Sequence, residues 1–215
     1  MTEPDHDCSL CPRLRSFILE NRSLHPDWHN GPVRTWYPAE GPRAVRLLVV
    51  GLAPGLRGAN RTGRPFTGDY AGDLLYATLG KFALSTGQFE ARVDDSLRLQ
   101  ATAITNAVRC VPPGNKPVGA EINTCRAFLS ATIAGLYRLD AIVTLGKISH
   151  DSTVRALGGR LSDHPFGHAA ETEIDGKRII SSYHCSRYNT NTGRLTTAMF
   201  EAVFETVTRH LAAVR

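Results

Sequence analysis

The sequence lacks a long apolar run, and no stretch of it is long and apolar enough to span a membrane. Residues 1–7 are polar and acidic, without the basic and apolar segments of a signal peptide. The chain also has no internal repeat, no low-complexity tract and no long linker. These absences argue against a membrane protein and a repeat array. We therefore expect a cytoplasmic protein that has no membrane partner.

Neither sign of charge is strongly in excess. The 215 residues include 25 Lys or Arg and 20 Asp or Glu, a small basic surplus that is compatible with a polyanionic partner but does not require one. A hydrophobic fraction of 42% and a charged fraction of 21% are typical of globular chains and exclude a disordered one. This length suits one domain with a sizeable core. We expect a single domain over residues 1–215, and a monomer.

Short apolar runs alternate with helical patterns along the chain. The apolar runs predict strands at residues 46–51, 101–108, 141–146 and 178–183. The helical patterns predict helices at residues 14–19, 69–84, 118–139, 148–157 and 193–214. Strands that alternate with helices imply an α/β fold with a parallel sheet covered on both faces. The chemistry of such folds lies at the carboxyl ends of the strands, here after Val50, Ala107, Leu145 and Tyr183.

The few cysteines, five in all, form a pattern. Cys8 and Cys11 are a close pair in the N-terminal arm (residues 1–41), Cys110 and Cys125 are a wide pair, and Cys185 is left over. Reduced cysteines in this number indicate a metal or reactivity rather than disulfides. A zinc ribbon would usually repeat the close pair, so a [4Fe–4S] cluster with four thiolate ligands is at least as plausible. Buried cysteines without a chemical role are the alternative, and it is weaker for the pair in the polar arm.

A glycine-rich segment at residues 51–68 follows the first strand and precedes a helix, so its backbone amides can face a ligand. It has neither the Gly-Lys-Ser/Thr of a P-loop nor a Gly-x-Gly-x-x-Gly fingerprint. Arg57, Arg61 and Arg64 give it positive charge. A flexible loop without function is the alternative, but unstructured segments of this length in compact domains are usually functional.

The segment 183–194, after the fourth strand, is dense in polar donors and carries an aromatic residue and two arginines before a helix. This mixture suits phosphate contacts together with a wedge inserted into a stack of bases. A capped helix start with a solvated loop is the alternative, and a lone histidine such as His184 is more often structural than catalytic.

Taken together and in order, these segments closely resemble the family 5 uracil-DNA glycosylases, also called UDGb. The resemblance covers the chain from Cys8 to the last helix, and four motifs carry it: Gly51-Leu-Ala-Pro-Gly55, Asn60-Arg-Thr-Gly-Arg-Pro-Phe-Thr-Gly-Asp69, Thr105-Asn-Ala-Val-Arg-Cys110 and His184-Cys-Ser-Arg-Tyr-Asn-Thr-Asn-Thr-Gly193. It implies a three-layer α/β/α sandwich with a central, mainly parallel four-stranded sheet. It also implies a bacterial or archaeal protein associated with the nucleoid.

In function, the resemblance implies base-excision repair: hydrolysis of the N-glycosidic bond of uracil in DNA, and of hypoxanthine and other deaminated or modified bases, after base flipping. It implies a [4Fe–4S] cluster that organises structure rather than carrying electrons. Its ligands would be Cys8, Cys11, Cys110 and Cys125, which are the four cysteines shared by families 4 and 5.

Roles for single residues follow from this mechanism. Asp69 can stabilise the sugar cation or orient water, and His184 can donate a hydrogen bond to the departing base. Phe66 is the candidate to stack on the flipped base and Asn106 to read its Watson–Crick edge, while Gly51 and Ala53 belong to the base-binding motif. Contacts to DNA are expected from Ser186, Arg187, Tyr188 and Arg61.

Each role has a structural alternative. Asp69 could instead cap the following helix, Phe66 could be a core ring, and Asn106 could form hydrogen bonds with neighbouring loops. Two departures from the superfamily pattern also matter. Ala53 stands where other members carry an Asp or Asn for the attacking water, and Cys185 replaces the usual Pro, which leaves ligation or reactivity of its thiol open. The rival functions are a non-enzymatic iron–sulfur or zinc nucleic-acid-binding protein and an electron carrier.

Overall fold

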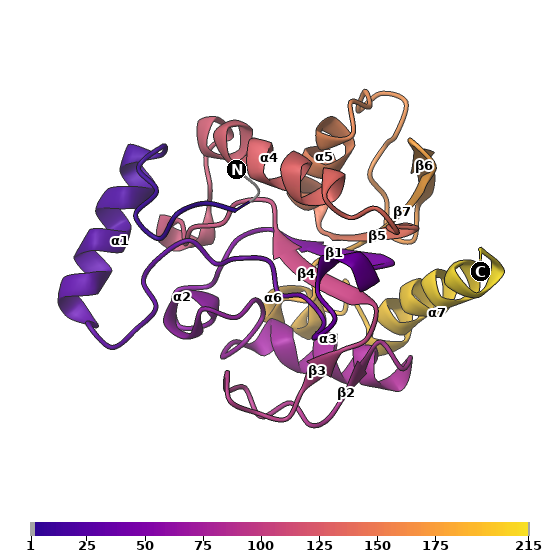
Figure 1. Ribbon diagram of the computed structural model, residues 1–215, viewed down its shortest axis with the longest axis horizontal. Helices are drawn as coiled ribbons and strands as arrows, with labels where there is room; N and C mark the ends of the chain where they lie inside the picture. The colour runs from indigo at the N-terminus through magenta and orange to yellow at the C-terminus, as the bar shows by residue number, and fades with distance from the viewer. Residues whose placement is uncertain (1–2, 215) are drawn as a thin grey trace.

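The computed structural model describes residues 3–214 and contains a central five-stranded sheet in the order β4-β1-β5-β7-β6 (Figure 1). Four of its strands are parallel and match the predicted runs: β1 (Leu47–Gly51), β4 (Thr102–Asn106), β5 (Ala141–Leu145) and β7 (Lys177–Ser182). The fifth strand, β6 (Glu171–Ile174), pairs antiparallel with β7 and was not predicted. Its residues alternate between exposed and half-buried at the edge of the sheet, so it has no apolar run to detect.

Helices cover both faces of this sheet, as predicted. Helices α3 (Tyr70–Lys81) and α7 (Thr197–Ala213) pack on one face, while α4 (Gly119–Ala134) and α5 (Lys147–Ala156) pack on the other (Figure 1). Successive side chains of β1 point to opposite faces of the sheet. Leu47 and Val49 pack into the core under α3 and α7, and Leu48 and Val50 pack into the core under α4. A strand that is buried on both sides reads as a continuous apolar run, and the three-layer α/β/α architecture is therefore confirmed.

The N-terminal arm is attached to the edge of the sheet. Its helix α1 (Pro12–Leu24) is longer than the predicted 14–19 and buries Leu14 and Ile18 against the part of α4 that carries Cys125. The chain then runs along the edge strand β4, where the Trp36 amide donates to the Ile104 carbonyl at 2.9 Å and the Ile104 amide returns a bond of 3.0 Å. This bridge covers an edge that would otherwise expose unpaired backbone groups.

The spacing of apolar residues in the sequence did not predict several short elements. Residues 51–68 are not wholly irregular, because they contain the one-turn helix α2 (Ala59–Thr62). A hairpin of β2 (Ser85–Thr86) and β3 (Arg98–Leu99) follows α3, and α6 (Arg187–Asn191) precedes α7; short 3-10 turns occupy Pro42–Ala44 and Pro113–Asn115. No helix within residues 3–214 is long and apolar enough to cross a membrane. Residues 1–2 and 215 of the predicted domain lie outside the described residues, and the single-domain and monomer assignments stay predictions.

Candidate active site

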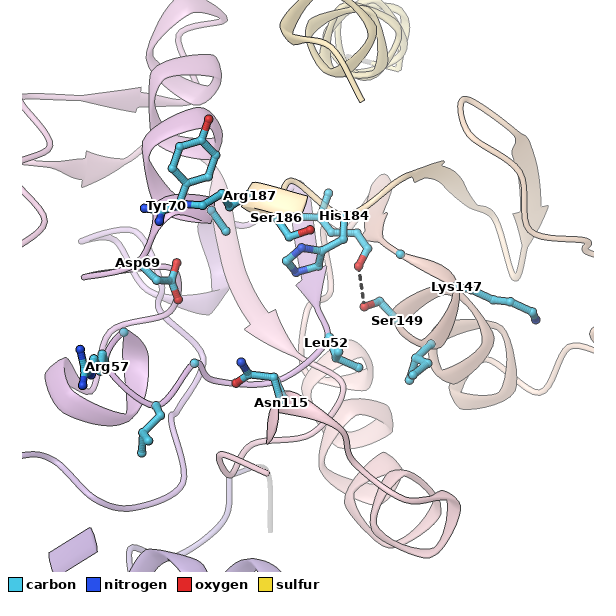
Figure 2. A pocket seen from close by; sticks show the side chains of 18 residues that line it. Leu52, Arg57, Asp69, Tyr70, Asn115, Lys147, Ser149, His184, Ser186 and Arg187 are labelled. Carbon is cyan, nitrogen blue, oxygen red and sulfur yellow. Dashed lines mark hydrogen bonds between the residues drawn. The ribbon is translucent and has the colours of Figure 1, made fainter. Parts of the chain in front are cut away.

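A cavity of about 820 Å³ opens at the carboxyl ends of the parallel strands, where the fold class predicts the chemistry (Figure 2). Its walls come from the segments that follow β1, β5 and β7, from the start of α3 and from the turn before α4. The lining residues are Leu52, Ala53, Gly55, Leu56, Arg57, Gly58, Asp69, Tyr70, Ala71, Asn115, Leu145, Gly146, Lys147, Ile148, Ser149, His184, Ser186 and Arg187.

Asp69 lies at the wall formed by the glycine-rich segment, at the N-cap position of α3 (Figure 2). Its side chain makes no capping hydrogen bond, and its buried Oδ1 has no hydrogen-bond partner within residues 3–214. Burial raises the pKa of this carboxyl, which the nearby amides of Ala71 and Gly72 lower only in part. These amides belong to the first turn of α3, so Asp69 stands in the capping position while its Oδ1 has no hydrogen-bond partner among residues 3–214.

Two glycines make room for this carboxylate. A Cβ on Gly55 would lie 2.8 Å from Asp69 Oδ2, and a Cβ on Gly58 would overlap the same oxygen. Gly55 and Gly58 therefore allow close packing of the backbone around the acid. Of the described residues that line the cavity, Asp69 alone carries a carboxylate.

His184 extends into the same cavity from the segment after β7, and Asp69 faces that space from the other side (Figure 2). Burial lowers the pKa of its imidazole to about 4, so the ring is neutral at pH 7. Neither of its ring nitrogens has a hydrogen-bond partner in the described part of the chain; its backbone carbonyl accepts a bond of 2.8 Å from Asn189 Nδ2. The ring therefore offers one free N–H donor to whatever occupies the cavity.

The predicted base-binding residues form a layer at the ends of β1 and β4. Ala53 lines the cavity, whereas Gly51, Phe66 and Asn106 are not among its lining residues. Gly51 and Asn106 are paired in register on adjacent strands, and a Cβ on Gly51 would lie 2.6 Å from Phe66 Cζ and would overlap Asn106 Oδ1. The ring of Phe66 lies 6.1 Å from that of His184 at an interplanar angle of 26°. Glycine is thus required here by the close approach of two side chains.

The predicted DNA contacts divide into separate groups. Ser186 lines the cavity and also caps α6 by accepting from the Asn189 amide, as the structural alternative expected. Arg187 lies 5.1 Å above the ring of Tyr70 at the rim, while Tyr188 is 73% exposed and free of the core. Arg61 is exposed on α2 but lines a separate, smaller groove of about 500 Å³, so it is not part of this cavity.

One basic residue of the glycine-rich segment was misinterpreted. Arg64 is buried, and its guanidinium forms two hydrogen bonds with Asp95, of 2.7 and 2.6 Å. It therefore adds no positive charge to the surface. No local pattern indicates this pairing, because Asp95 lies in the hairpin region, 31 residues further along the chain.

The four predicted cluster ligands come together although they are far apart in sequence. Cys8, Cys11, Cys110 and Cys125 line one small cavity between the arm and α4. Burial, followed by the neighbouring cysteines, raises the pKa of the Cys110 thiol, and burial raises that of Cys125 to about 11. Within residues 3–214, no three or more Cys, His, Asp or Glu side chains are arranged as a site for a single metal ion.

Other lining residues were not found from the sequence. Asn115 reaches the cavity from the Pro113–Asn115 turn, and Lys147 and Ser149 do so from the first turn of α5 (Figure 2). The Ser149 hydroxyl is already used, because it donates to the Leu145 carbonyl at 3.0 Å. Lys147 points outward and pairs with Asp151 at 2.7 Å. The sequence predicted a site at the carboxyl ends of the strands. It did not identify these side chains, because they reach the cavity only in the folded structure.

Known proteins are similar to this chain over most of its length. The family model of the uracil DNA glycosylase superfamily matches residues 38–208. A type-5 uracil-DNA glycosylase of Thermus thermophilus is 42% identical over 200 residues, which cover 90% of this chain and 89% of the relative. This chain belongs to the type-5 uracil-DNA glycosylase family. Type-5 relatives from Mycobacterium bovis (40% identical; 92% of this chain, 75% of the relative) and Pyrobaculum aerophilum (36%; 88% and 83%) are also similar.

Membership of the type-5 family confirms the resemblance inferred from the motifs and gives context to the two departures. Ala53 lines the cavity without a polar side-chain group, and Asp69 is the carboxylate among the described lining residues. Cys185 is fully buried in the core under α3 and α7, and burial raises the pKa of its thiol. It packs at 3.5 Å from the Ala71 carbonyl and does not line the cysteine cavity.

Proposed function

We propose that this protein excises uracil from DNA by hydrolysing the bond between the base and its sugar. One observation carries the proposal: a carboxylate and a neutral imidazole, each with an unpartnered polar atom within the described residues, face the same cavity at the carboxyl ends of the strands. The type-5 relatives are named as uracil-DNA glycosylases, which is the activity that such a pair can support.

The reaction leaves negative charge on the base and positive character on the sugar. The neutral His184 imidazole donates its N–H to the carbonyl oxygen of the departing base, where the charge develops. Asp69 lies across the cavity, where it stabilises the sugar cation or orients the attacking water. Because its pKa is raised by burial, Asp69 needs a pH above that raised value to act as a carboxylate.

Base recognition falls to the layer at the ends of β1 and β4. The Asn106 side chain is 2% exposed overall and has no hydrogen-bond partner in residues 3–214, so its amide is available to the Watson–Crick edge of a base. Phe66 supplies an apolar ring next to it for stacking. The cavity volume of about 820 Å³ is in the upper part of the range for small-molecule pockets, which favours hypoxanthine and other deaminated bases as further substrates.

Base flipping costs a few kcal/mol, and a side chain that fills the vacated stack offsets it. We assign this wedge to Tyr188, because it is exposed and stands beside the cavity rim, whereas Arg187 is held against Tyr70. Arg187 and Arg57, at the rim, are placed to contact phosphates. Arg61 would contact DNA only outside the cavity.

A [4Fe–4S] cluster is the cofactor that the cysteine set fits best. Four cysteines line one cavity without the arrangement of a single-ion site, and a four-iron cluster needs wider spacing because each thiolate binds a different iron. The fully buried Arg109 adjoins Cys110, and its amide donates to Cys125 Sγ at 3.3 Å. The Arg109 guanidinium also pairs with Glu3 at 3.3 Å, so it would offset only part of the charge of four thiolates. Cys8, Cys11, Cys110 and Cys125 would hold the cluster, which would fasten the arm to α4.

The decisive experiment is single-turnover release of labelled uracil from a duplex that contains one uracil. His184→Ala and Asp69→Asn should each slow release by about a hundredfold or more, the typical cost of one donor or charge aimed at the transition state, and should leave duplex affinity nearly unchanged. Asp163→Asn, an exposed acid outside the cavity, is the matched control. Tight binding with no release by the unmodified protein would favour a non-enzymatic nucleic-acid-binding protein instead.

A further inference from the structure

Phe66 has a backbone conformation that an aromatic residue rarely adopts. Its φ of 52° lies in the left-handed region, which residues other than Gly, Asn and Asp rarely adopt. Its carbonyl oxygen also approaches α3 so closely that a Cβ on Gly72 would overlap it. Such a conformation persists only where the surrounding structure enforces it, so the contacts on either side of Phe66 must hold it there.

Those contacts centre on Arg64. Its Nε donates to Thr67 Oγ1 at 2.7 Å, so one guanidinium ties together the residues that flank the Pro65–Phe66 pair. Thr67 Oγ1 in turn donates to the Pro65 carbonyl at 3.2 Å, and the Tyr76 hydroxyl donates to the same carbonyl. The peptide group that joins Pro65 to Phe66 is therefore fixed by two side-chain hydrogen bonds.

Asp95 fixes the guanidinium itself. Its two oxygens accept from Arg64 Nη1 and Nη2 at 2.7 and 2.6 Å, and it also accepts from the amides of Glu90 and Leu97 at 3.1 and 3.2 Å. The Arg64 and Asp95 side chains are only 7% and 0% exposed. Burial alone would raise the pKa of Asp95, but the bonds from Arg64 hold it at about 2, so the pair remains charged.

Aromatic rings complete the enclosure. The Arg64 guanidinium carbon lies 4.8 Å from the centre of the Trp36 ring, 5.9 Å from Tyr76 and 5.8 Å from Phe89. These rings come from the arm, from α3 and from the hairpin region, so three separate parts of the chain hold one side chain. Bidentate geometry and stacked rings are demands that Lys cannot meet.

We propose that the Arg64–Asp95 pair is a positioning device for the base-stacking ring. It fixes the chain on both sides of Phe66 and so holds the ring against Gly51 and Asn106 before a base arrives. This inference rests on the proposed function of the cavity. Neither residue touches the base: Asp95 acts through Arg64, and Arg64 acts through the backbone of residues 65–67. A buried charged pair that served stability alone would have no reason to enforce a left-handed aromatic residue.

The test is a double-mutant cycle on single-turnover uracil release. Asp95→Asn should slow release by roughly tenfold to a hundredfold, because small misplacements of a binding group have effects of that size. In a Phe66→Leu background the same substitution should change the rate by less than about twofold, because the ring on which it acts is gone. Asp140→Asn is the matched control, since it breaks the part-buried Arg46–Asp140 pair of 2.6 Å at the opposite ends of the strands.

Equal slowing by Asp95→Asn in both backgrounds, or no slowing, would overturn the proposal. Thr67→Val, which removes only the hydroxyl between Arg64 and Pro65, repeats the cycle if Asp95→Asn folds poorly. A crystal structure of whichever variant is used provides an independent test: φ of Phe66 should leave the left-handed region, and an unmoved Phe66 refutes the inference. If the unmodified protein and Asp140→Asn release no uracil, the proposed function fails, and the crystal structure alone decides on the positioning device.

Discussion

The neutral charge state of His184 leads to a quantitative expectation for the pH dependence of catalysis. Burial lowers the pKa of this imidazole from 6.5 to about 4, a change that corresponds to about 3 kcal/mol against protonation in place. At pH 5.5 a solvated histidine would be roughly nine-tenths protonated, whereas His184 should be only about 3% protonated. Lowering the pH from 8 to 5.5 should therefore leave its hydrogen-bond donor unchanged.

Asp69 also affects the pH dependence of the rate, but its pKa is shifted upward, whereas that of His184 is shifted downward. Burial raises the pKa of Asp69, so the proposed catalytic carboxylate should be protonated at a higher pH than a solvated aspartate, and we expect the acid limb of the rate profile to arise from this residue. Single-turnover uracil release should be measured from pH 5.5 to 8 in the unmodified protein, in Asp69→Asn and in Asp69→Asn/His184→Asn. In Asp69→Asn the residual rate should stay level within about twofold, since His184 does not titrate there.

A limb with a midpoint near pH 6.5 that survives in Asp69→Asn and disappears in the double variant would refute the reasoning. NMR provides a check that does not depend on activity. The histidine ε1 resonance that His184→Asn removes should not titrate between pH 5.5 and 8. A titrating signal would mean that the ring is solvated and that an imidazolium, not an imidazole, meets the base.

Three further outcomes are expected. Gly58→Ala should lower the rate of uracil release strongly, because its Cβ overlaps Asp69 Oδ2, whereas Gly135→Ala, whose nearest contact would be 3.5 Å, should not; equal rates would contradict the packing argument. Protein purified without oxygen should contain iron that Cys125→Ser removes and Cys185→Ala retains, and elemental analysis that shows zinc without iron would exclude the cluster. Duplex affinity should fall steeply with salt, because phosphate contacts release counterions, and a salt-independent affinity would argue for a small-molecule substrate.

Prediction from the sequence succeeded where a single physical pattern decides the structure. The run from Leu47 to Gly51 is apolar throughout because both faces of β1 are buried, and so the strand and the two helical layers were predictable. β6 was missed because an edge strand with alternating Glu and Thr has no such run. The one-turn helix α2 and the five-residue α6 are too short to show a helical period.

The site was predictable only as far as local motifs reach. Asp69 and His184 were identified because they stand in motifs at strand ends, and both line the cavity. Asn115 was not predicted because the turn before α4, which carries it, comes close to the cavity only in the folded structure. Arg64 looked like a surface charge, since nothing in its neighbourhood in sequence indicates a partner as distant as Asp95. Pairing of this kind depends on the fold and cannot be inferred from spacing.

The bridge between Trp36 and Ile104 has a consequence for the order in which the protein is made. Synthesis proceeds at about 5–20 residues per second, and the arm leaves the ribosome several seconds before the strand that it covers. Until Ile104 and Arg109 are made, Trp36 and Val33 lack the backbone partners that they have in the folded structure, and Cys8 and Cys11 must wait for Cys110 and Cys125. The first segment to be translated therefore docks late, and Cys8 and Cys11 stay apart from Cys110 and Cys125 during that interval.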